Sequence, residues 1–290
     1  MESAFQIHEN KSLKDLSTFG IGGLCKFFTE AKTENEMRES FFFAKKKQIP
    51  FLVLGKGSNC LFDDRGFNGL VILNKIDYCK YSELKVEVGA GYSFSLLGVQ
   101  TAKKGWSGLE FASGIPASVG GAVYMNAGAN QTETVEALNS VLYMHDNGEI
   151  EAFDKKDLQF GYRFSSFQNM KGAIIGATFV FTFSSHARNH QIEIIGYRTR
   201  TQPYSDKSAG CIFRNPSTLS AGALIEKSGL KGYQFGGAAV SNKHANFLIN
   251  KESASSEDIK ELIRIVKRQV KTQMGVDLDV EIKIISPDGC

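Results

Sequence analysis

The segment Gly108–Asn130, GLEFASGIPASVGGAVYMNAGAN, is the part of this chain that most limits what it can form. Gly and Ala are its commonest residues, and Glu110 is its only charged residue. So few bulky side chains cannot build a core, but they leave main-chain N–H groups open to close approach by a polyanionic ligand. A tightly packed Gly/Ala turn region of an α/β enzyme would have the same composition, and both interpretations stay open at this point.

The length of 290 residues corresponds to two or three domains, and the 42% apolar content with 22 Phe supplies ample core material. The net charge of +3 is dispersed, and short basic clusters such as Lys45–Lys47 are typical of solvated helix faces. We therefore expect no nucleic-acid partner. The longest apolar stretch, Ala173–Phe183, is too short to span a bilayer, so we expect no membrane association either.

The cysteine pattern argues against a disulfide framework. The five cysteines are odd in number and form no CxxC pair, which is typical of reduced thiols in a cytoplasm. The five histidines show no metal-ligand spacing, so we expect no metal site. The cysteines are Cys25, Cys60, Cys79, Cys211 and Cys290.

The first 75 residues have the pattern of a small α/β unit. Thr33–Glu36 is a capping box that predicts a helix to about Lys47. Phe51–Leu54 predicts a short buried strand that leads directly into a glycine-rich turn, Gly55–Asn59. Gly69–Asn74 predicts a further strand.

The middle of the chain predicts an α+β domain with a mostly antiparallel sheet. The strands expected there are Lys85–Gly89, Val141–Met144, Glu149–Phe153 and Ala173–Phe183. Asp146-Asn-Gly148 is a hairpin signal between two of them.

A polar stretch, Ser184–Gln191, precedes a third region. In that region Ala221–Ser228 predicts a helix and Phe247–Ile249 a strand. Ser255–Asp258 caps a long helix whose apolar stripe indicates core packing, and Gly275 ends it. A final strand, Leu278–Ile285, is expected to pair back onto the first domain.

The turn Gly55–Asn59, Gly-Lys-Gly-Ser-Asn, is typical of a loop whose main-chain N–H groups bind phosphate. Its spacing is neither that of a Walker loop nor that of the GxGxxG turn of a Rossmann domain. ATP chemistry and a Rossmann site therefore receive no support, and an ordinary tight turn remains the alternative.

Three further side chains could carry chemistry. Arg163, between aromatic residues, suits a bidentate carboxylate or phosphate contact, although it could be a surface residue of a hairpin. Cys211 follows a glycine, and a thiol with a reference pKa of roughly 8.5 can release a proton near neutral pH. An inert buried cysteine is the commoner case. Glu281 lies in a strand-like pattern, where most acidic side chains face water.

The order of the motifs carries more information than any one motif. The series runs through Thr18–Gly23, Val53–Asn59, Gly108–Gly128, Tyr162–Arg163, Ala209–Pro216, Gly229–Gly232, Gly236–Asn246 and Leu278–Glu281. In this order it closely resembles the UDP-N-acetylenolpyruvoylglucosamine reductase (MurB) family, the flavin reductases of peptidoglycan precursor synthesis. The resemblance covers nearly the whole chain, from about Thr18 to Ile285.

The resemblance implies an α+β fold with three domains. Two would be FAD-binding domains of the type shared with vanillyl-alcohol-oxidase-like flavoenzymes, over residues 1–75 together with 276–290 and over residues 76–200. A smaller α+β domain over residues 201–275 would bind the substrate. The chain is short between Phe183 and Gln202, so it looks like the compact type of the family, which lacks an extra loop.

The resemblance also implies the reaction. NADPH reduces FAD, which then reduces the enolpyruvyl group of a UDP-sugar, UDP-N-acetylglucosamine enolpyruvate, to UDP-N-acetylmuramate. By position, Arg163 and Glu281 match the pair that holds and polarises the substrate carboxylate, and Cys211 matches the general acid. We expect a cytoplasmic monomer.

Binding residues follow from the same resemblance. Tyr162 would help to orient the substrate. The other substrate-binding residues would be Arg214, Asn215, Lys231 and Lys243. The FAD-binding residues would be Gly55, Lys56, Gly57, Ser58, Asn59, Gly114, Ile115, Pro116, Gly120 and Gly121.

Three positions depart from the family pattern. The family usually has serine where this chain has Cys211; a thiol is more acidic and can still deliver the proton, but it is open to oxidation. We therefore expect thiol reagents to block activity. Arg214 stands where lysine is usual, which keeps the charge and alters the contact geometry. Lys207 replaces an apolar residue or a proline.

Two other classes of protein share part of the pattern. Another FAD enzyme of the same architecture, such as an oxidase of small alcohols or hydroxy acids, would keep the glycine-rich turns and ignore NADPH. It would have no reason to keep Arg163, Cys211 and Glu281 in these contexts. A non-enzymatic module would bind a sugar nucleotide or a flavin without turnover, and a purified protein without flavin absorbance would favour that class.

Overall fold

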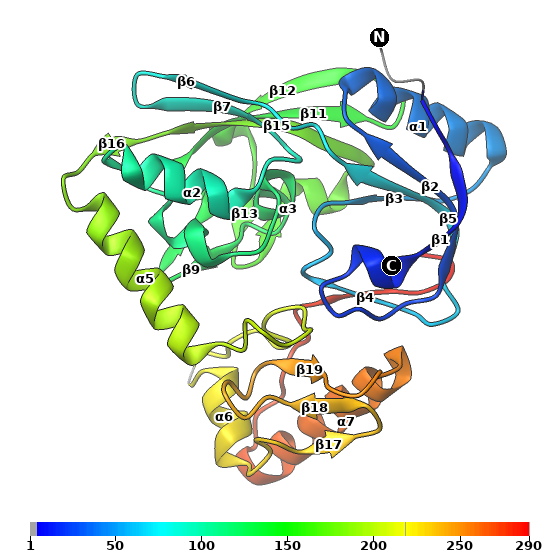
Figure 1. The fold of residues 1–290 in the computed structure, drawn as a ribbon, viewed down its shortest axis with the longest axis vertical. Helices are drawn as coiled ribbons and strands as arrows, with labels where there is room; N and C mark the ends of the chain where they lie inside the picture. Colours follow the sequence, from blue (N-terminus) through cyan, green and yellow to red (C-terminus); the bar gives the residue numbers. More distant parts are fainter. Residues whose placement is uncertain (1–4, 218, 290) are drawn as a thin grey trace. The chain divides into compact units, whose positions relative to one another are not determined.

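The computed structural model describes residues 5–217 and 219–289, which divide into two compact units (Figure 1). The first unit comprises Phe28–Lys56, Leu70–Arg198 and the described residues up to His8. The second unit comprises Glu9–Phe27, Gly57–Gly69 and the described residues from Thr199 onward. The three-domain boundaries expected from the sequence stay a prediction.

Two strands, β2 (Leu24–Ala31) and β5 (Phe67–Asn74), run from one unit into the other. They are the inner strands of a sheet of order β1-β2-β5-β3, in which β1 is His8–Ser12 and β3 is Phe51–Leu54. The pairing of β3 with β5 is parallel. The strand predicted over Phe51–Leu54 is therefore confirmed.

Helix α1 (Glu34–Lys47) precedes β3 and begins as its sequence predicts. The Thr33 hydroxyl accepts the Glu36 N–H at 3.1 Å, and the Glu36 carboxylate accepts the Thr33 N–H at 3.1 Å. This capping box satisfies two main-chain donors that the first helical turn leaves unpaired.

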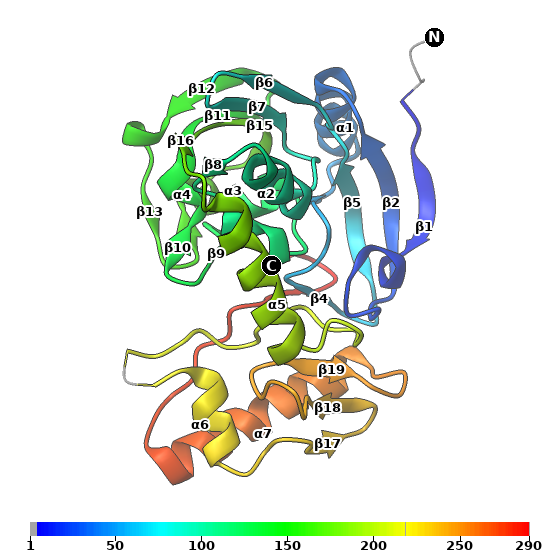
Figure 2. The same ribbon diagram turned by 60° about the vertical axis from the view of Figure 1, so that its left-hand side comes forward.

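The largest sheet lies in the first unit and is antiparallel throughout, as predicted for the middle of the chain. Its order is β12-β11-β15-β7-β6, and helices α2 (Phe94–Lys103) and α3 (Val119–Tyr124) lie against one face (Figures 1 and 2). Apolar side chains from the sheet and both helices form one buried core. The strands are β6 (Cys79–Ser82), β7 (Lys85–Gly89), β11 (Leu138–His145), β12 (Ile150–Asp154) and β15 (Gly172–Val180).

Short elements fill the remainder of the first unit. Three two-residue pairs are β8 (Trp106–Ser107) with β16 (Thr182–Phe183), β9 (Gly128–Ala129) with β10 (Thr132–Glu133), and β13 (Phe160–Gly161) with β14 (Phe164–Ser165). The short helices are α4 (Thr134–Ala137) and three 3-10 turns at Glu110–Gly114, Lys155–Asp157 and Ser166–Asn169.

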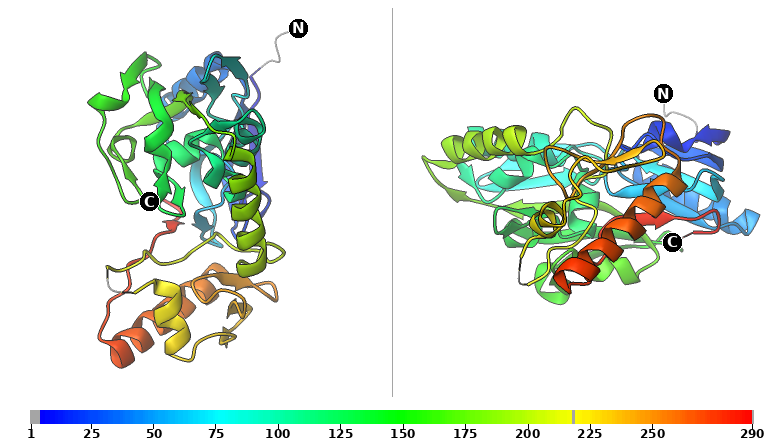
Figure 3. Two further views of the ribbon diagram at one scale, coloured as in Figure 1. Left: turned by 90° about the vertical axis from the view of Figure 1, so that its left-hand side faces the viewer. Right: turned by 90° about the horizontal axis from the view of Figure 1, so that it is seen from below.

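The second unit contains a three-stranded sheet with a long helix against it (Figure 3). The apolar stripe of α7 (Ser256–Met274) is buried in the core of this unit, as predicted, and Gly275 ends the helix with φ of 71°. The other elements are a 3-10 turn at Leu13–Leu16, β4 (Cys60–Phe62), α6 (Ala221–Lys227), β17 (Gln234–Phe235), β18 (Ala238–Val240), β19 (Leu248–Asn250) and β20 (Lys283–Ile285).

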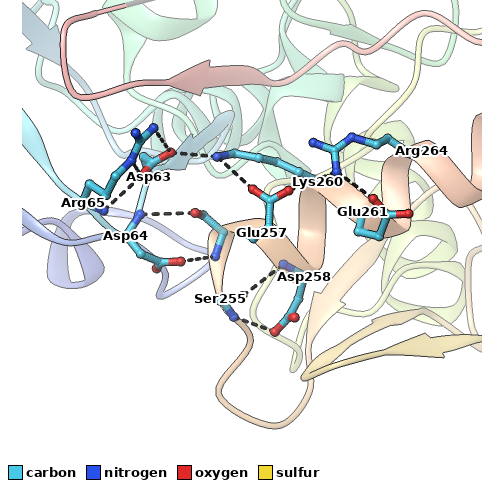
Figure 4. A network of polar contacts seen from close by, with 10 residues as sticks. Asp63, Asp64, Arg65, Ser255, Glu257, Asp258, Lys260, Glu261 and Arg264 are labelled. Atoms are coloured by element: carbon cyan, nitrogen blue, oxygen red, sulfur yellow. Dashed lines mark hydrogen bonds and ion pairs between the residues drawn. The ribbon is translucent and has the colours of Figure 1, made fainter.

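A network of polar contacts fixes the loop after β4 to the start of α7 (Figure 4). The buried Asp63 carboxylate accepts from Arg65 Nε at 2.8 Å and from Lys260 Nζ at 2.7 Å. The Ser256 N–H donates to the Asp64 carboxylate at 2.6 Å, and the Asp64 N–H donates back to the Ser256 hydroxyl at 3.2 Å. These contacts join residues about 190 positions apart in the sequence and hold β4 in place.

Two expectations need correction. The strand expected over Leu278–Ile285 is regular only in β20, because Val280 forms an isolated bridge to Phe213 instead of continuing the pairing with β4. The pairing of this segment with residues of the first 75 is nevertheless confirmed. The strand expected at Phe247–Ile249 is Leu248–Asn250, because Phe247 bridges to Cys211.

Helix α5 (Ala187–Thr201) begins inside the polar stretch Ser184–Gln191 and was not predicted. Only three of its side chains are buried, those of Ala187, Gln191 and Ile194. The sequence of this helix therefore has no apolar stripe from which it could be predicted. In the part of the chain that the structure describes, no helix has the length and apolarity needed to cross a membrane.

Candidate active site

The turn after β3 meets the start of α3 inside the first unit. A Cβ on Gly55 would collide with the hydroxyl of Ser118, so only glycine allows this close approach. The Ser118 hydroxyl caps α3 by accepting the Gly121 N–H at 3.2 Å. Two of the segments expected to bind the cofactor are thus neighbours.

Lys56 extends from this turn toward α2. Its ammonium group donates to the Ser93 hydroxyl at 2.9 Å, and Ser93 is the N-cap residue of α2. Partial burial of the ammonium group, and secondly the charge of Lys75, lowers the pKa of Lys56. A bound anion would raise this pKa again, because it stabilises the charged ammonium group. The position of Lys56 therefore suits contact with a phosphate oxygen.

The glycines of α3 are used for packing as well as for access. The Gly120 N–H donates to the Ala90 carbonyl at 2.8 Å, and a Cβ on Gly120 would lie 2.9 Å from that of Ala90. The N–H groups of Gly120 and Gly121 are therefore taken by protein acceptors. The Cβ position of Gly120 faces Ala90, so only Gly121 leaves room for close approach to Cα. Neither glycine offers the open N–H group that the sequence suggests.

The remaining cofactor candidates of the first unit follow a 3-10 turn. Gly114 is buried at the end of Glu110–Gly114, Ile115 is half-buried and Pro116 is exposed. The Ile115 N–H donates to the Ala112 carbonyl at 2.8 Å and so closes the turn.

Gly57–Asn59 belongs to the second unit. Gly57 has φ of 61°, and a Cβ there would collide with the Leu16 carbonyl oxygen. Ser58 is half-buried in the turn that follows. The Asn59 carbonyl accepts the Lys283 N–H at 2.9 Å, and the Asn59 side chain donates to the Glu281 carbonyl at 3.5 Å.

Arg163 is the second residue of the two-residue turn between β13 and β14, and its φ is 56°. A left-handed conformation at this position normally selects glycine or asparagine, and strain of this kind clusters at functional sites. The guanidinium lies 4.8 Å from the centre of the Tyr162 ring and donates to the Gly128 carbonyl at 3.1 Å. The hairpin therefore holds a strained, oriented cation.

Two amide side chains that the sequence did not single out support this hairpin. Gln168 Nε2 donates to the carbonyls of Arg163 and Tyr124, each at 3.0 Å. Asn126, fully buried, donates to the Gly161 carbonyl at 3.0 Å and to the Glu133 carboxylate at 2.7 Å. The bonds from Asn126 to Gly161 and from Gln168 to Tyr124 span 35 and 44 residues, so they leave no local signal in the sequence.

In the second unit, main-chain hydrogen bonds join the segment that carries Cys211 to the segment that carries Glu281. The Glu281 N–H donates to the carbonyl of Ile212 at 2.7 Å, and the Arg214 N–H donates to the Asp279 carbonyl at 2.8 Å. These two bonds enclose the antiparallel bridge of Phe213 with Val280. Both Cys211 and Glu281 are half-buried.

Asn246 fixes the same segment from its other side. Its fully buried side chain accepts the Phe213 N–H at 3.0 Å and donates to the Phe213 carbonyl at 2.8 Å. The Asn246 carbonyl accepts the Ile212 N–H at 2.9 Å. Cys211 therefore lies on a segment held by hydrogen bonds along both edges.

The residues expected to contact the UDP portion lie in the second unit and already have protein contacts. Lys231 pairs with Glu226 at 2.8 Å, and Lys243 Nζ donates to the Thr199 carbonyl at 2.7 Å near the end of α5. The Asn215 side chain accepts the Ala221 N–H at 3.0 Å at the start of α6. To bind phosphate, Lys231 and Lys243 would have to give up their contacts with Glu226 and with the Thr199 carbonyl.

The unusual Lys207 lies along Gly20. A Cβ on Gly20, whose φ is 64°, would lie 3.1 Å from Lys207 Cδ. The Lys207 stem therefore covers a glycine turn of the Thr18–Gly23 motif. Within residues 5–217 and 219–289, no group of His, Cys, Asp and Glu side chains could hold a metal ion.

Comparison with known proteins identifies the family. The family model described as UDP-N-acetylenolpyruvoylglucosamine reductase, C-terminal domain, matches residues 202–285, and the model described as FAD binding domain matches residues 25–154. A UDP-N-acetylenolpyruvoylglucosamine reductase of Protochlamydia amoebophila is 54% identical over 284 residues, which cover 98% of this chain and 95% of the relative. The chain belongs to the UDP-N-acetylenolpyruvoylglucosamine reductase family.

Further relatives agree with this assignment. A reductase of the same name from Chlamydia felis is 44% identical over 97% of this chain and 95% of its own length. The crystal structure of the MurB enzyme of Thermus caldophilus has a TM-score of 0.83 and 35% identity, and it covers 96% of this chain and 98% of its own. The family resemblance and the α+β fold class are confirmed.

FAD is the cofactor of this family, and the residues of the first unit fit it. At Gly55 the turn packs directly on Ser118, so two of the glycine-rich segments expected to bind the diphosphate lie side by side. Lys56 supplies a cation whose present partner is a neutral hydroxyl.

Proposed function

We propose that this chain reduces the enolpyruvyl group of UDP-N-acetylglucosamine enolpyruvate to UDP-N-acetylmuramate, with FAD as cofactor and NADPH as reductant. The reaction follows from family membership over nearly the whole length of both chains. The roles proposed for single residues are supported by one observation, the main-chain bond from Glu281 to Ile212, which joins the segment that carries Glu281 to the segment that carries Cys211. Held by the glycine-rich segments proposed above, FAD would supply the two-electron chemistry between NADPH and the enolpyruvyl group.

Cys211 is proposed as the proton donor. Addition of hydride to the terminal vinyl carbon leaves an electron pair on the neighbouring carbon, next to the carboxylate. The Cys211 S–H gives its proton to that carbon and becomes a thiolate, which balances the reduction. The hydrogen bonds on both sides of Ile212 and Phe213 keep the thiol in a fixed position for this transfer.

Arg163 and Glu281 are proposed to hold and polarise the substrate carboxylate. Negative charge develops there in the transition state, and an oriented guanidinium lowers its energy without reorganisation. The stacking of Arg163 on Tyr162 and its bond to Gly128 support this role, because both restrict the guanidinium before substrate binds. Glu281 is restrained by its main chain in the same way.

The UDP portion is proposed to contact Asn215, Lys231 and Lys243. Tyr162 is proposed to orient the substrate, and Arg214 is proposed as a further substrate-binding residue. Exposed lysines can exchange a carboxylate or carbonyl partner for a phosphate at low free-energy cost, because surface ion pairs contribute only about 0–1 kcal/mol. Lys231 and Lys243 are both of this kind.

We further propose a cytoplasmic monomer with the three domains expected from the sequence. Cys25 and Cys79 are free thiols, which supports a reducing compartment. Light scattering during gel filtration measures the oligomeric state, and a mass near 32 kDa is expected from the chain mass of 31.9 kDa. A mass twice as large would contradict the monomer.

A visible spectrum of the purified protein tests the function. We expect a flavin band that NADPH bleaches anaerobically and that the enolpyruvyl sugar nucleotide then restores, with UDP-N-acetylmuramate as product. A flavin band that NADPH leaves unchanged would favour an oxidase. A protein that neither carries nor binds flavin would favour a non-enzymatic module.

A further inference from the structure

The hairpin that carries Arg163 cannot hold its turn by itself. Its ladder joins only two residue pairs, and isolated hairpins are marginally stable in water. The turns favoured in two-residue hairpins have a positive φ at their first central residue. Here the first, Tyr162, is not left-handed, whereas the second, Arg163, has φ of 56°. The conformation of this turn therefore depends on contacts from outside the hairpin.

The carboxamide of Gln168 supplies such a contact to Arg163 itself. Its Nε2 atom donates to the Arg163 carbonyl and to the Tyr124 carbonyl, each at 3.0 Å. Tyr124 is the last residue of α3, and carbonyls at the C-terminal end of a helix have no partner within the helix. One half-buried side chain therefore joins the turn of the hairpin to the end of α3.

Three further bonds attach the same hairpin to residues at the end of α3 and just after it. The Ser165 hydroxyl donates to the Tyr124 carbonyl at 2.7 Å. The Asn126 side chain donates to a carbonyl of β13 at 3.0 Å. The Arg163 guanidinium donates to the Gly128 carbonyl at 3.1 Å. These bonds fix the hairpin to α3, and all of them lie within the first unit.

Helix α3 connects this attachment to the proposed reaction. Its N-cap residue, Ser118, lies where a Cβ on Gly55 would be, so the helix begins beside a turn proposed to bind FAD. The proposed carboxylate-binding cation is attached to its other end. Catalysis needs the cation at a fixed position relative to the cofactor, because a misplacement of about 1 Å can cost about 10²-fold in rate.

We infer that Gln168 is a positioning residue, which acts on the proposed reaction through Arg163. The inference rests on the proposed function, in which Arg163 holds the substrate carboxylate. Without the Gln168 N–H groups the Arg163 carbonyl loses this partner, and the strained turn can relax. The guanidinium then leaves the position in which it stacks on Tyr162. Asn126 and Ser165 also support the hairpin, but both are fully buried, so substitutions there would disturb the fold.

The experiment is anaerobic stopped-flow absorbance on the full-length, flavin-loaded enzyme. Gln168→Met keeps the length of the side chain and removes its N–H donors. Reoxidation of the reduced flavin by the enolpyruvyl substrate should slow about 10- to 100-fold, while reduction by NADPH stays within about threefold of the wild type. Gln168→Lys supplies an ammonium group that can donate to both carbonyls, so it should restore most of the rate. Gln168→Glu places acceptors against carbonyl oxygens and should be at least as slow as Gln168→Met.

A double-mutant cycle separates positioning from a general structural role. If Gln168 acts through Arg163, then Gln168→Met should have no further effect on reoxidation in the Arg163→Ala background. Gln100→Met is the matched control. It removes a half-buried carboxamide on α2 that accepts hydrogen bonds from Tyr81 and Tyr92, each at 2.7 Å. Both half-reactions should keep their wild-type rates in this control.

Wild-type reoxidation in Gln168→Met would overturn the inference, and so would a slowing that persists in full in the Arg163→Ala background. A loss as large in Gln100→Met would do the same, since the effect would then not be specific to the hairpin. If Gln168→Met does not fold, Gln168→Lys and Gln168→Glu carry the comparison, and equal reoxidation rates in these two would overturn the inference.

Failure of the proposed function gives a different result. Reduced wild-type flavin that does not react with the enolpyruvyl substrate would contradict the function itself. Wild-type reoxidation in Arg163→Ala would contradict the role of Arg163, and with it the inference. Slow reoxidation in Arg163→Ala together with wild-type reoxidation in Gln168→Met would contradict only the positioning role of Gln168.

Discussion

The Glu281 N–H donates to the carbonyl of Ile212 at 2.7 Å, so the last strand-like segment of the chain is attached to the residue that follows Cys211. Asn59 bonds to the same segment through both its carbonyl and its side chain. The segments that carry three predicted site residues, Asn59, Cys211 and Glu281, are thus joined by hydrogen bonds within the second unit. This junction makes separate predictions for the thiol and for the carboxylate.

Cys211→Ala should slow reoxidation of the reduced flavin by the enolpyruvyl substrate by about 10²- to 10⁴-fold, the usual contribution of a general acid. Reduction by NADPH should change little, because that step needs no proton at the substrate carbon. Stopped-flow absorbance separates the two half-reactions. Cys211→Ser should retain substantial activity, since a hydroxyl can also supply the proton. Equal losses in both half-reactions would contradict the donor role.

Thiol reagents should inactivate the enzyme through Cys211. Cys25 is fully buried, and burial raises the pKa of its thiol to about 11, so it should react slowly. Burial also raises the pKa of Cys79. Cys211→Ser should resist iodoacetamide while Cys79→Ser stays sensitive, as measured by residual activity. Inactivation of Cys211→Ser at the wild-type rate would place the reactive thiol elsewhere.

Glu281→Gln should slow the second half-reaction far more than the first, by at least about tenfold. The amide has the size of the carboxylate and leaves the main-chain bond to Ile212 intact, so the fold should not change. Circular dichroism melts provide that control. Turnover at the wild-type rate would remove Glu281 from the mechanism.

Arg163 allows stability and activity to be separated at one position. Its φ of 56° strains any residue with a Cβ, so Arg163→Gly should be more stable than Arg163→Ala by about 1 kcal/mol in urea unfolding. Both variants should lose at least about 10²-fold in kcat/KM, because neither supplies the cation. A stable and active Arg163→Gly would mean that the side chain has no part in the reaction.

Local signals explain which parts of the fold could be predicted from the sequence. The capping boxes at Thr33 and Ser255 and the left-handed Gly275 depend on residues a few positions apart, so α1 and α7 are read correctly. Helix α5 has no apolar stripe and was missed. The segment Leu278–Ile285 has a strand pattern throughout, but only the distant partners Phe213 and Cys60 decide where its pairing changes.

The residues of the candidate site also divide into those that the sequence predicts and those that it does not. The order of motifs was enough to select Arg163, Cys211 and Glu281 as candidates. Gln168, Asn126 and Asn246 were missed, because each supports a main-chain group at least 5 and up to 44 positions away and belongs to no chemical pattern. Gly120 lies in a segment whose composition is typical of a ligand-binding loop. Its N–H nevertheless donates to the Ala90 carbonyl, and this pairing is visible only in the structure.

Asp63→Asn should destabilise the protein by about 2–4 kcal/mol at pH 7, because it removes one partner of a buried ion pair with Lys260. Hydrogen bonds from Arg65, and then from Lys260, hold the pKa of Asp63 well below its usual range. A folded-state pKa below the unfolded value of about 3.9 contributes stability above that pH and loses it as the pH falls. The difference in unfolding free energy between wild type and variant should therefore be constant above about pH 5 and shrink by about 1 kcal/mol per unit below pH 4.

Urea unfolding at pH 7, 5, 4 and 3 measures this dependence on acidity. Asp15→Asn is the matched control, because the Lys11–Asp15 pair is exposed and its loss should cost less than about 0.5 kcal/mol at any pH. The Asp63 network anchors the loop directly after β4, whose first residue follows Asn59, so loosening it should also weaken the junction with Glu281. A pH-independent difference between wild type and Asp63→Asn would show that packing around Asp63, and not its charge, holds α7 to that loop.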